Sequence, residues 1–130
     1  MIWGIGIDNA AVDRFADKLQ NAAFCARVYG EEERALLAGR TGRRAAEGAA
    51  GCFAAKEAFL KAAGRGLGGF ALPDLQALRA ESGAPYLAFS GAAAAWMQEN
   101  RLTAHLSITH DGGIATAIVL LEQWAEELDL

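Results

Sequence analysis

The chain of 130 residues has no apolar run that approaches the roughly 18–20 residues needed by a membrane-spanning helix. A short apolar stretch opens the sequence, but no basic region precedes it, as a secretory signal would require. We therefore expect a cytoplasmic protein without a membrane partner. Internal repeats, low-complexity tracts and linkers are also lacking.

Basic charge is scarce as well, because 12 lysines and arginines stand against 16 aspartates and glutamates, a net charge of −4. Proteins that bind nucleic acids need a basic footprint, so we expect no nucleic-acid partner, although a local basic patch is compatible with this balance. The only two cysteines, Cys25 and Cys52, show no metal-ligand spacing. Both fall in helical patterns, and without an export signal we interpret them as small core residues rather than a disulfide.

What the sequence does contain is typical of a folded globular protein. Apolar residues make up 53% of it and charged residues 22%. Its length is enough to bury a core but too short for two ordinary domains. The sequence therefore predicts one domain over residues 1–130.

The stretch from Phe53 to Gly64 is rich in helix-forming residues and ends in a glycine suited to a helix C-terminus. Glu57 and Lys61 stand four residues apart and share one face of this helix. One interpretation is a surface helix with an ordinary ion pair, which contributes roughly 0.2–0.5 kcal/mol. The other is a functional site, because the surrounding residues are mostly small or apolar, and buried charges need a partner, a metal or a ligand.

A second carboxylate stands in a similar setting. Asp8 follows an apolar run, residues 2–7, that predicts a buried strand. One carboxylate at a strand end and one on a helix suit a hard divalent cation such as Mg²⁺, which takes oxygen ligands and leaves positions for substrate phosphates. Lys61, one turn beyond Glu57, would face those phosphates. Gly4-Ile5-Gly6 lacks the third glycine of a dinucleotide fingerprint, so a Rossmann fold is not favoured.

Three segments carry a resemblance to a known family. They are Gly4-Ile5-Gly6-Ile7-Asp8, Phe53-Ala54-Ala55-Lys56-Glu57-Ala58 with Lys61-Ala62, and His105-Leu106-Ser107-Ile108-Thr109-His110-Asp111. In order and spacing they resemble the motifs of the holo-[acyl-carrier-protein] synthases, the small bacterial 4′-phosphopantetheinyl transferases. The resemblance implies the α+β fold of these transferases, a small antiparallel-rich sheet packed against helices.

The same resemblance implies the reaction. It is the Mg²⁺-dependent transfer of 4′-phosphopantetheine from coenzyme A to a serine of apo acyl carrier protein, in support of fatty acid biosynthesis. It further implies a homotrimer with the active site between subunits, because one short chain supplies only part of the coenzyme A pocket.

Individual roles follow from the matching positions. Asp8 and Glu57 are implied as metal ligands, and Arg14 as a contact to the carrier protein. Either Glu57 or a metal-bound water would take the serine proton. The residues implied as catalytic are Glu57, Lys61 and His110, and those implied to bind coenzyme A are Lys61, Arg65, Gly66 and His110.

Two positions depart from the family pattern. Cys52 stands where the family commonly has an arginine, which bears on nucleotide or packing contacts, and Ala11 stands where it tends to have an acid. Two alternatives therefore stay open beside the implied function. One is a transferase repurposed for a dedicated polyketide or peptide carrier, and the other is a non-catalytic domain of this fold that binds nucleotides or a partner.

The periodicity of apolar residues predicts the remaining elements. Residues 118–121 predict a central strand, because they have little polar interruption. Residues 39–44 predict a turn with a basic cluster, which is either a solvated loop or a contact to phosphates or the carrier. We expect strands over 2–8, 75–80, 86–89, 102–109 and 114–122, and helices over 12–29, 31–37, 45–63, 91–100 and 123–130.

Overall fold

A computed structural model describes residues 1–66 and 69–125. The elements are β1 (Ile2–Ala11), α1 (Asp13–Lys18), α2 (Ala22–Val28), α3 (Glu31–Ala38), α4 (Gly42–Ala62), a 3₁₀ turn η1 (Leu72–Asp74), β2 (Leu75–Arg79), β3 (Pro85–Phe89), α5 (Gly91–Glu99), β4 (Leu102–Asp111) and β5 (Ile114–Gln123).

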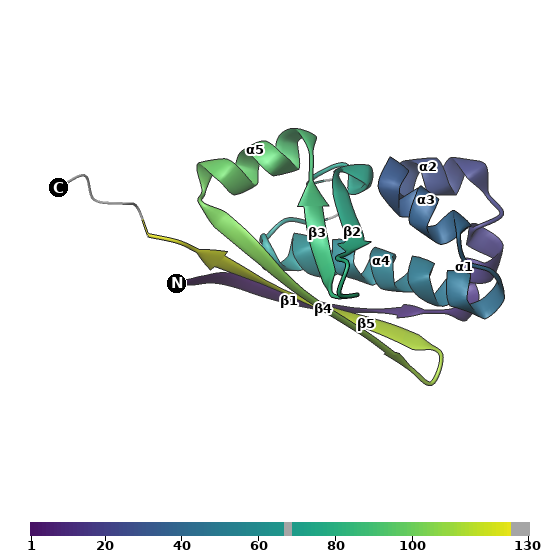
Figure 1. Ribbon diagram of the computed structural model, residues 1–130. Coiled ribbons are helices and arrows are strands. Elements are labelled where there is room, and N and C mark those ends of the chain that lie inside the picture. The colour runs from purple at the N-terminus through teal and green to yellow at the C-terminus, as the bar shows by residue number, and fades with distance from the viewer. Residues whose placement is uncertain (67–68, 126–130) are drawn as a thin grey trace.

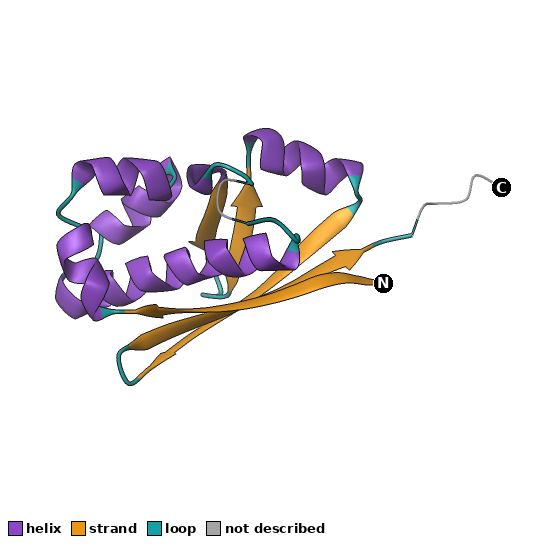
Figure 2. Cartoon of the chain, turned by 180° about the vertical axis from the view of Figure 1, so that it is seen from behind, coloured by secondary structure: helices purple, strands orange, loops and turns teal. Residues whose placement is uncertain are grey.

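The strands form two antiparallel sheets, one of three strands in the order β1-β5-β4 and one hairpin of β2 and β3. The described helices lie on one face of the three-stranded sheet (Figure 1), and the view from behind likewise shows no described helix against the opposite face (Figure 2). This arrangement confirms the α+β class and the central place predicted for β5.

Helix α4 packs closely on β1 because two glycines of β1 face it. A Cβ atom on Gly6 would lie closer than 3.0 Å to the carbonyl oxygen of Ala58, and one on Gly4 would meet the carbonyl oxygen of Ala62 in the same way. Side chains alternate along a strand, so Asp8 points toward the helix as well. The glycine face thus brings Asp8 next to the C-terminal half of α4.

The prediction that β1 is a buried strand was wrong for one of its faces. Ile5 and Ile7 are 60% and 57% exposed, because α4 covers only the face that carries Gly4 and Gly6. Ile118 of β5, which pairs with Ile7, is also exposed. These three isoleucines are the apolar centre of the sheet surface that faces away from the helices, called the outer sheet face below.

Two helix boundaries also differ from the sequence predictions. The helix expected over 12–29 is divided into α1 and α2, because the Asn21 side chain accepts a hydrogen bond from the Phe24 backbone N–H (3.0 Å) and starts a new helix. Helix α4 begins at Gly42, so Arg43 and Arg44 are helical rather than part of a turn.

Near the C-terminus, Gln123 ends β5 instead of beginning a helix. Residues 126–130 of the helix expected over 123–130 lie outside the described residues. The other predicted strands and helices agree with the structure to within a few residues.

Both cysteines are free thiols, Cys52 buried and Cys25 partly buried, which confirms their interpretation as packing residues. No helix in the part of the chain that the structure describes is long and apolar enough to cross a membrane.

Candidate active site

Strand β1 and helix α4 bring together the three predicted residues of the first two motifs. The Lys61 ammonium donates hydrogen bonds to Oδ1 of Asp8 (2.9 Å) and to the carbonyl oxygen of Ile7 (3.0 Å). Glu57 lies one turn before Lys61 on α4, close enough to Asp8 for their charges to interact. The Asp8 side chain is 22% exposed and that of Lys61 55%, so the ammonium remains accessible to a ligand.

Glu57 is the residue of this group whose charge is least well compensated. Its Oε1 atom is buried and has no hydrogen-bond partner among the described residues. The pKa of Glu57 is raised above its ordinary value, mainly by burial and further by the negative charge of Asp8, while Lys61 lowers it. A buried carboxylate oxygen without a donor, beside a second carboxylate, is a position that a cation would stabilise.

The donor set fits a hard cation bound in an open site. Magnesium is usually held by one or two carboxylates, with its other positions filled by waters and substrate phosphates. Within residues 1–66 and 69–125, no three or more histidine, cysteine, aspartate or glutamate side chains gather into a metal cluster. The donors that Asp8 and Glu57 offer are carboxylate oxygens, which suit Mg²⁺ better than a zinc site built from thiolates and imidazoles.

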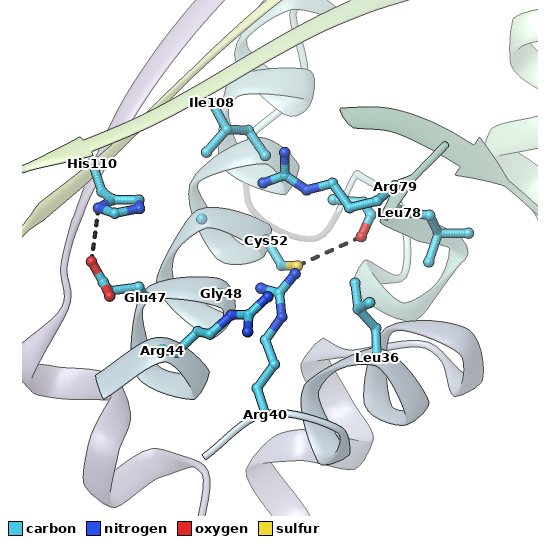
Figure 3. Close-up of a pocket in the computed structure, with 12 residues that line it drawn as sticks. Leu36, Arg40, Arg44, Glu47, Gly48, Cys52, Leu78, Arg79, Ile108 and His110 are labelled. Atoms are coloured by element: carbon cyan, nitrogen blue, oxygen red, sulfur yellow. Dashed lines mark hydrogen bonds and ion pairs between the residues drawn. The ribbon is translucent and has the colours of Figure 1, made fainter. Parts of the chain in front are cut away.

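A second candidate site is a pocket of about 220 Å³ on the other side of α4 (Figure 3). Three arginines reach it from different elements: Arg40 from the segment after α3, Arg44 from α4 and Arg79 from the end of β2. Figure 3 shows the ends of Arg40 and Arg44 close to each other beside Cys52, with Arg79 extending into the pocket from the opposite wall. His110 of β4 completes the wall, and we call these four residues the arginine pocket.

The charge in the arginine pocket is unbalanced. Among the described residues, no carboxylate forms an ion pair with Arg40, Arg44 or Arg79. The one carboxylate that lines the pocket, Glu47, lies 2.7 Å from Nδ1 of His110. A guanidinium group can donate two parallel hydrogen bonds to the oxygens of one phosphate. Three guanidinium groups around one cavity therefore form a site for an anionic group.

Cys52 lies in the wall of this pocket and is not a reactive thiol. Burial, together with the nearby Glu33 carboxylate, raises the pKa of Cys52 to about 12, and its thiol lies 3.6 Å from the carbonyl oxygen of Ala77. Arg40 passes directly over Gly48, where a Cβ atom would clash with its guanidinium. Position 52 carries no guanidinium group, but Arg40, from the segment before α4, brings one to the same part of the pocket.

The other predicted residues lie apart from these two sites. The Arg65 guanidinium stacks on the rings of Phe70 (4.5 Å) and Trp96 (5.5 Å), just beyond the end of α4 that carries Lys61. Gly66 is exposed, with open space around its Cα. Arg14 is exposed on α1.

His110 is not brought to Asp8. It lies on β4, and Asp8 lies on β1, at opposite edges of the β1-β5-β4 sheet. The structure thus divides the predicted site into a carboxylate half and an arginine half.

Sequence reasoning missed part of the arginine half. The sequence predicts Arg40 and Arg44 in a turn, either a solvated loop or a contact to phosphates or the carrier, whereas in the structure both line the arginine pocket. The signal was the spacing of Arg44, Glu47 and Gly51, which is helical if α4 begins at Gly42. No local signal marks Arg79, because it joins the pocket only through the docking of β2.

Comparison with known proteins gives consistent results. Residues 4–119 match the family model of the 4′-phosphopantetheinyl transferase superfamily. A holo-[acyl-carrier-protein] synthase of Trichlorobacter lovleyi is 40% identical over 126 residues, covering 94% of this chain and 98% of the relative. One from Latilactobacillus sakei is 39% identical, covering 95% and 99%.

Solved structures of such synthases share the fold. The crystal structure from Bacillus anthracis, in complex with CoA (3′,5′-ADP), has a TM-score of 0.81 and 37% identity, and the match covers 95% of this chain and 99% of that one. The ACPS-CoA complex from Chronobacterium ammoniagenes has a TM-score of 0.79 and 29% identity, with 94% and 98% covered. With a family model matched over most of its length and relatives near 40% identity along nearly the whole chain, the chain belongs to the 4′-phosphopantetheinyl transferase superfamily.

Proposed function

We propose that this chain transfers the 4′-phosphopantetheine group of coenzyme A to a serine of an apo acyl carrier protein, in support of fatty acid biosynthesis. The observation that carries the proposal is the meeting of Asp8, Glu57 and Lys61 between β1 and α4, in a chain about 40% identical to named holo-[acyl-carrier-protein] synthases. The expected cytoplasmic location belongs to this proposal, and two free thiols are in keeping with a reducing compartment.

The reaction is a displacement at phosphorus. The serine oxygen attacks the phosphorus that carries the pantetheine arm, the bond from this phosphorus to the bridging oxygen breaks, and adenosine 3′,5′-bisphosphate leaves. Such reactions depend mainly on positioning and on stabilisation of charge. Lys61 holds the pyrophosphate and stabilises the leaving oxygen with its ammonium, which lies half exposed at the mouth of the site.

Asp8 and Glu57 would hold Mg²⁺. When bound, the ion would supply neutralisation of the pyrophosphate charge. The fit rests on the unpartnered Oε1 atom of Glu57 and on the second carboxylate beside it. A carboxylate at this position would also serve as an acceptor of the serine proton.

The arginine pocket, which includes His110, binds the nucleotide phosphates of coenzyme A. The cation excess supports this role, because three guanidinium groups face one carboxylate there. Arg65 and Gly66 keep their assignment to coenzyme A at the Lys61 end of α4, where the Arg65 guanidinium stacks on Phe70 and Trp96. Arg14, exposed on α1, meets an acidic surface of the carrier protein.

The assembly proposed is a homotrimer with active sites between chains. The carboxylate half and the arginine half lie at opposite edges of one sheet, so neighbouring chains that each provide one half would form a site between subunits. The outer sheet face supports this assembly, because Ile5, Ile7 and Ile118 leave an apolar surface that a second chain would cover.

The test is intact-mass spectrometry of an apo acyl carrier protein incubated with this chain, coenzyme A and Mg²⁺. We expect a gain of one phosphopantetheine mass, which a chelator abolishes. Coenzyme A binding without any mass gain on several carriers would contradict the proposal and point to a binding module. If the mass gain is observed, competition between fatty-acid and polyketide carriers identifies the preferred partner.

A further inference from the structure

Two charged side chains are fully buried and have no part in the reaction described above. Glu33 of α3 and Lys56 of α4 each have a side chain that is 0% exposed. Lys56 directly precedes Glu57, but neighbouring residues on a helix point about 100° apart, so it faces away from Asp8. Burial of a charge is costly unless the charge is paired and hydrogen-bonded, so this pair needs an explanation.

The pair is completely hydrogen-bonded. The Lys56 ammonium donates to Oε1 of Glu33 (2.5 Å) and to the carbonyl oxygens of Leu72 (2.9 Å) and Leu75 (2.8 Å), which uses all three of its protons. The Glu33 carboxylate accepts from the backbone N–H of Gly30 at Oε1 and of Ala77 at Oε2, both at 2.9 Å. These five directional bonds join α3, α4 and the η1-β2 segment.

Helices α3 and α4 and strand β2 also line the arginine pocket, together with β4. Ala77 lines the pocket, with its N–H bonded to Glu33 and its carbonyl oxygen to the Cys52 thiol. Arg79 lies two residues further along β2, on the same face as Ala77. Arg40 follows α3, the helix that carries Glu33. Movement of α3 or β2 relative to α4 would therefore separate the three guanidinium groups.

We propose that Glu33 and Lys56 are a positioning pair for the arginine pocket, holding α3, β2 and α4 at the spacing at which Arg40, Arg44 and Arg79 converge on one anion. The inference rests on the proposed function only in naming coenzyme A as the source of that anion. The pair touches no substrate. It sets the affinity for coenzyme A through the arginines and leaves the chemistry at Asp8, Glu57 and Lys61 unaltered.

A merely stabilising role would not require this arrangement. Apolar residues of similar volume often replace a buried ion pair with no loss of stability, whereas they cannot reproduce five directional hydrogen bonds. We therefore expect the variant Glu33→Gln/Lys56→Met to fold. It should bind coenzyme A roughly 10- to 100-fold more weakly, because small misplacements of binding groups have effects of this size. The kcat at saturating coenzyme A and the Mg²⁺ half-saturation should stay within about twofold of the parent.

The experiment measures coenzyme A binding by calorimetry, and KM and kcat with apo carrier protein, for the parent and Glu33→Gln/Lys56→Met. Glu31→Gln, an exposed acid on the same helix, is the matched control. Thermal unfolding verifies that each variant is folded. If Glu33→Gln/Lys56→Met does not fold, Glu33→Asp replaces it, because it keeps the paired charge but shortens by one methylene group the side chain that reaches Lys56 and the Ala77 N–H.

The decisive step repeats the change in an Arg40→Ala/Arg79→Ala background. If the pair acts through these arginines, it has no further effect on coenzyme A affinity there. An equal loss in both backgrounds, a fall in kcat with unchanged affinity, or no change at all would overturn the inference. Failure of the parent chain to bind coenzyme A would instead contradict the proposed function, so the two failures are distinguishable.

Discussion

Glu57 is the side chain of the site whose negative charge is most destabilised by its surroundings. Its buried oxygen lacks a donor among the described residues, and its pKa is raised by burial and by Asp8. The folded chain therefore holds the Glu57 proton more tightly than the unfolded chain does. As pH rises from the ordinary value of 4.5 through the raised pKa, the contribution of Glu57 to the free energy of unfolding falls. Cation affinity rises over the same window, because the carboxylate binds metal only when deprotonated.

The first prediction concerns Glu57→Gln. Without Mg²⁺ at neutral pH, this variant should unfold at a temperature a few degrees higher than the parent, because it removes a poorly compensated negative charge beside Asp8. Its kcat should fall at least about 100-fold with loss of the cation site and of the proton acceptor. Calorimetric unfolding and Mg²⁺ titration of activity at a series of pH values measure both effects. An unchanged Mg²⁺ half-saturation in Glu57→Gln would show that Glu57 is not a ligand.

The second prediction concerns Arg40 and its neighbour Cys52. Arg40→Ala should weaken coenzyme A binding about tenfold, the size expected for a charge-assisted hydrogen bond, with kcat retained. Cys52→Arg added to Arg40→Ala should recover much of this affinity, because the new guanidinium enters the same pocket from α4. Gly48→Ala should mimic Arg40→Ala, since its Cβ would displace the Arg40 guanidinium.

Arg43 offers a matched control for this series. It is the residue before Arg44 but pairs with Asp13 at 3.3 Å on an exposed surface outside the pocket. Arg43→Ala should leave coenzyme A affinity unchanged in calorimetric titration. If Arg43→Ala and Arg40→Ala weaken binding equally, general loss of positive charge rather than the pocket is responsible.

The contact of β1 with α4 fixes the distance between the carboxylates, and glycine makes this contact possible. The third prediction is that Gly6→Ala forces α4 away from β1, because the new Cβ would clash with the Ala58 carbonyl and the Ala62 amide. Overpacking of this kind costs about 1–3 kcal/mol, which urea denaturation measures. The kcat should fall even where the variant is fully folded, because the displacement of α4 separates Asp8 from Glu57. Gly39→Ala, where the new atom makes only ordinary contacts, should change the free energy of unfolding by less than about 0.5 kcal/mol.

The sequence predicted the elements whose own composition determines them, such as α4 with its strong helix formers and β5 with its apolar alternation. It predicted Asp8, Glu57 and Lys61 as one group, because two share a helix face and the third ends an apolar run. The break at Asn21 was missed because a single side-chain cap decides it, and the start of α4 at Gly42 was missed because no side-chain cap marks it.

Contacts between distant segments lay beyond the reach of sequence patterns. Glu33 and Lys56 each look like ordinary surface charges in the sequence, and only the docking of α3 on α4 buries them together. Arg79 joins the pocket through the pairing of β2 with its neighbours. The exposed faces of Ile5 and Ile7 were missed for the opposite reason, because an apolar run does not show which face a helix will cover.

The outer sheet face connects this exposed surface to assembly. The fourth prediction is that Ile7→Lys leaves the chain folded but reduces the particle mass in light scattering from three times 13.7 kDa toward a single chain. Burying a lysine charge at the centre of an apolar interface is more unfavourable than the apolar contact is favourable. In an isolated chain the position is 57% exposed, so the lysine stays in water. Activity should be lost with the assembly. Full activity in a monomeric variant would contradict a site shared between chains.

The division of the site predicts complementation between inactive chains. Asp8→Ala removes the carboxylate half and Arg40→Ala/Arg79→Ala removes the arginine half, so each assembly alone should be inactive at low coenzyme A concentration. Co-expressed in equal amounts, the two chains should form mixed trimers. In a closed ring, an intact carboxylate half meets an intact arginine half at about a quarter of the interfaces, and a corresponding part of the activity should return.

A site contained in one chain gives the opposite result, because neither variant then carries both halves and mixing restores nothing. Assaying the two variants mixed without subunit exchange separates complementation from residual activity, and intact-mass analysis of the carrier protein measures each outcome. Recovery only after exchange would mean that coenzyme A lies between β1 of one chain and β4 of the next. The bare sheet face, the exposed isoleucines and the separation of Asp8 from His110 would then share one physical cause.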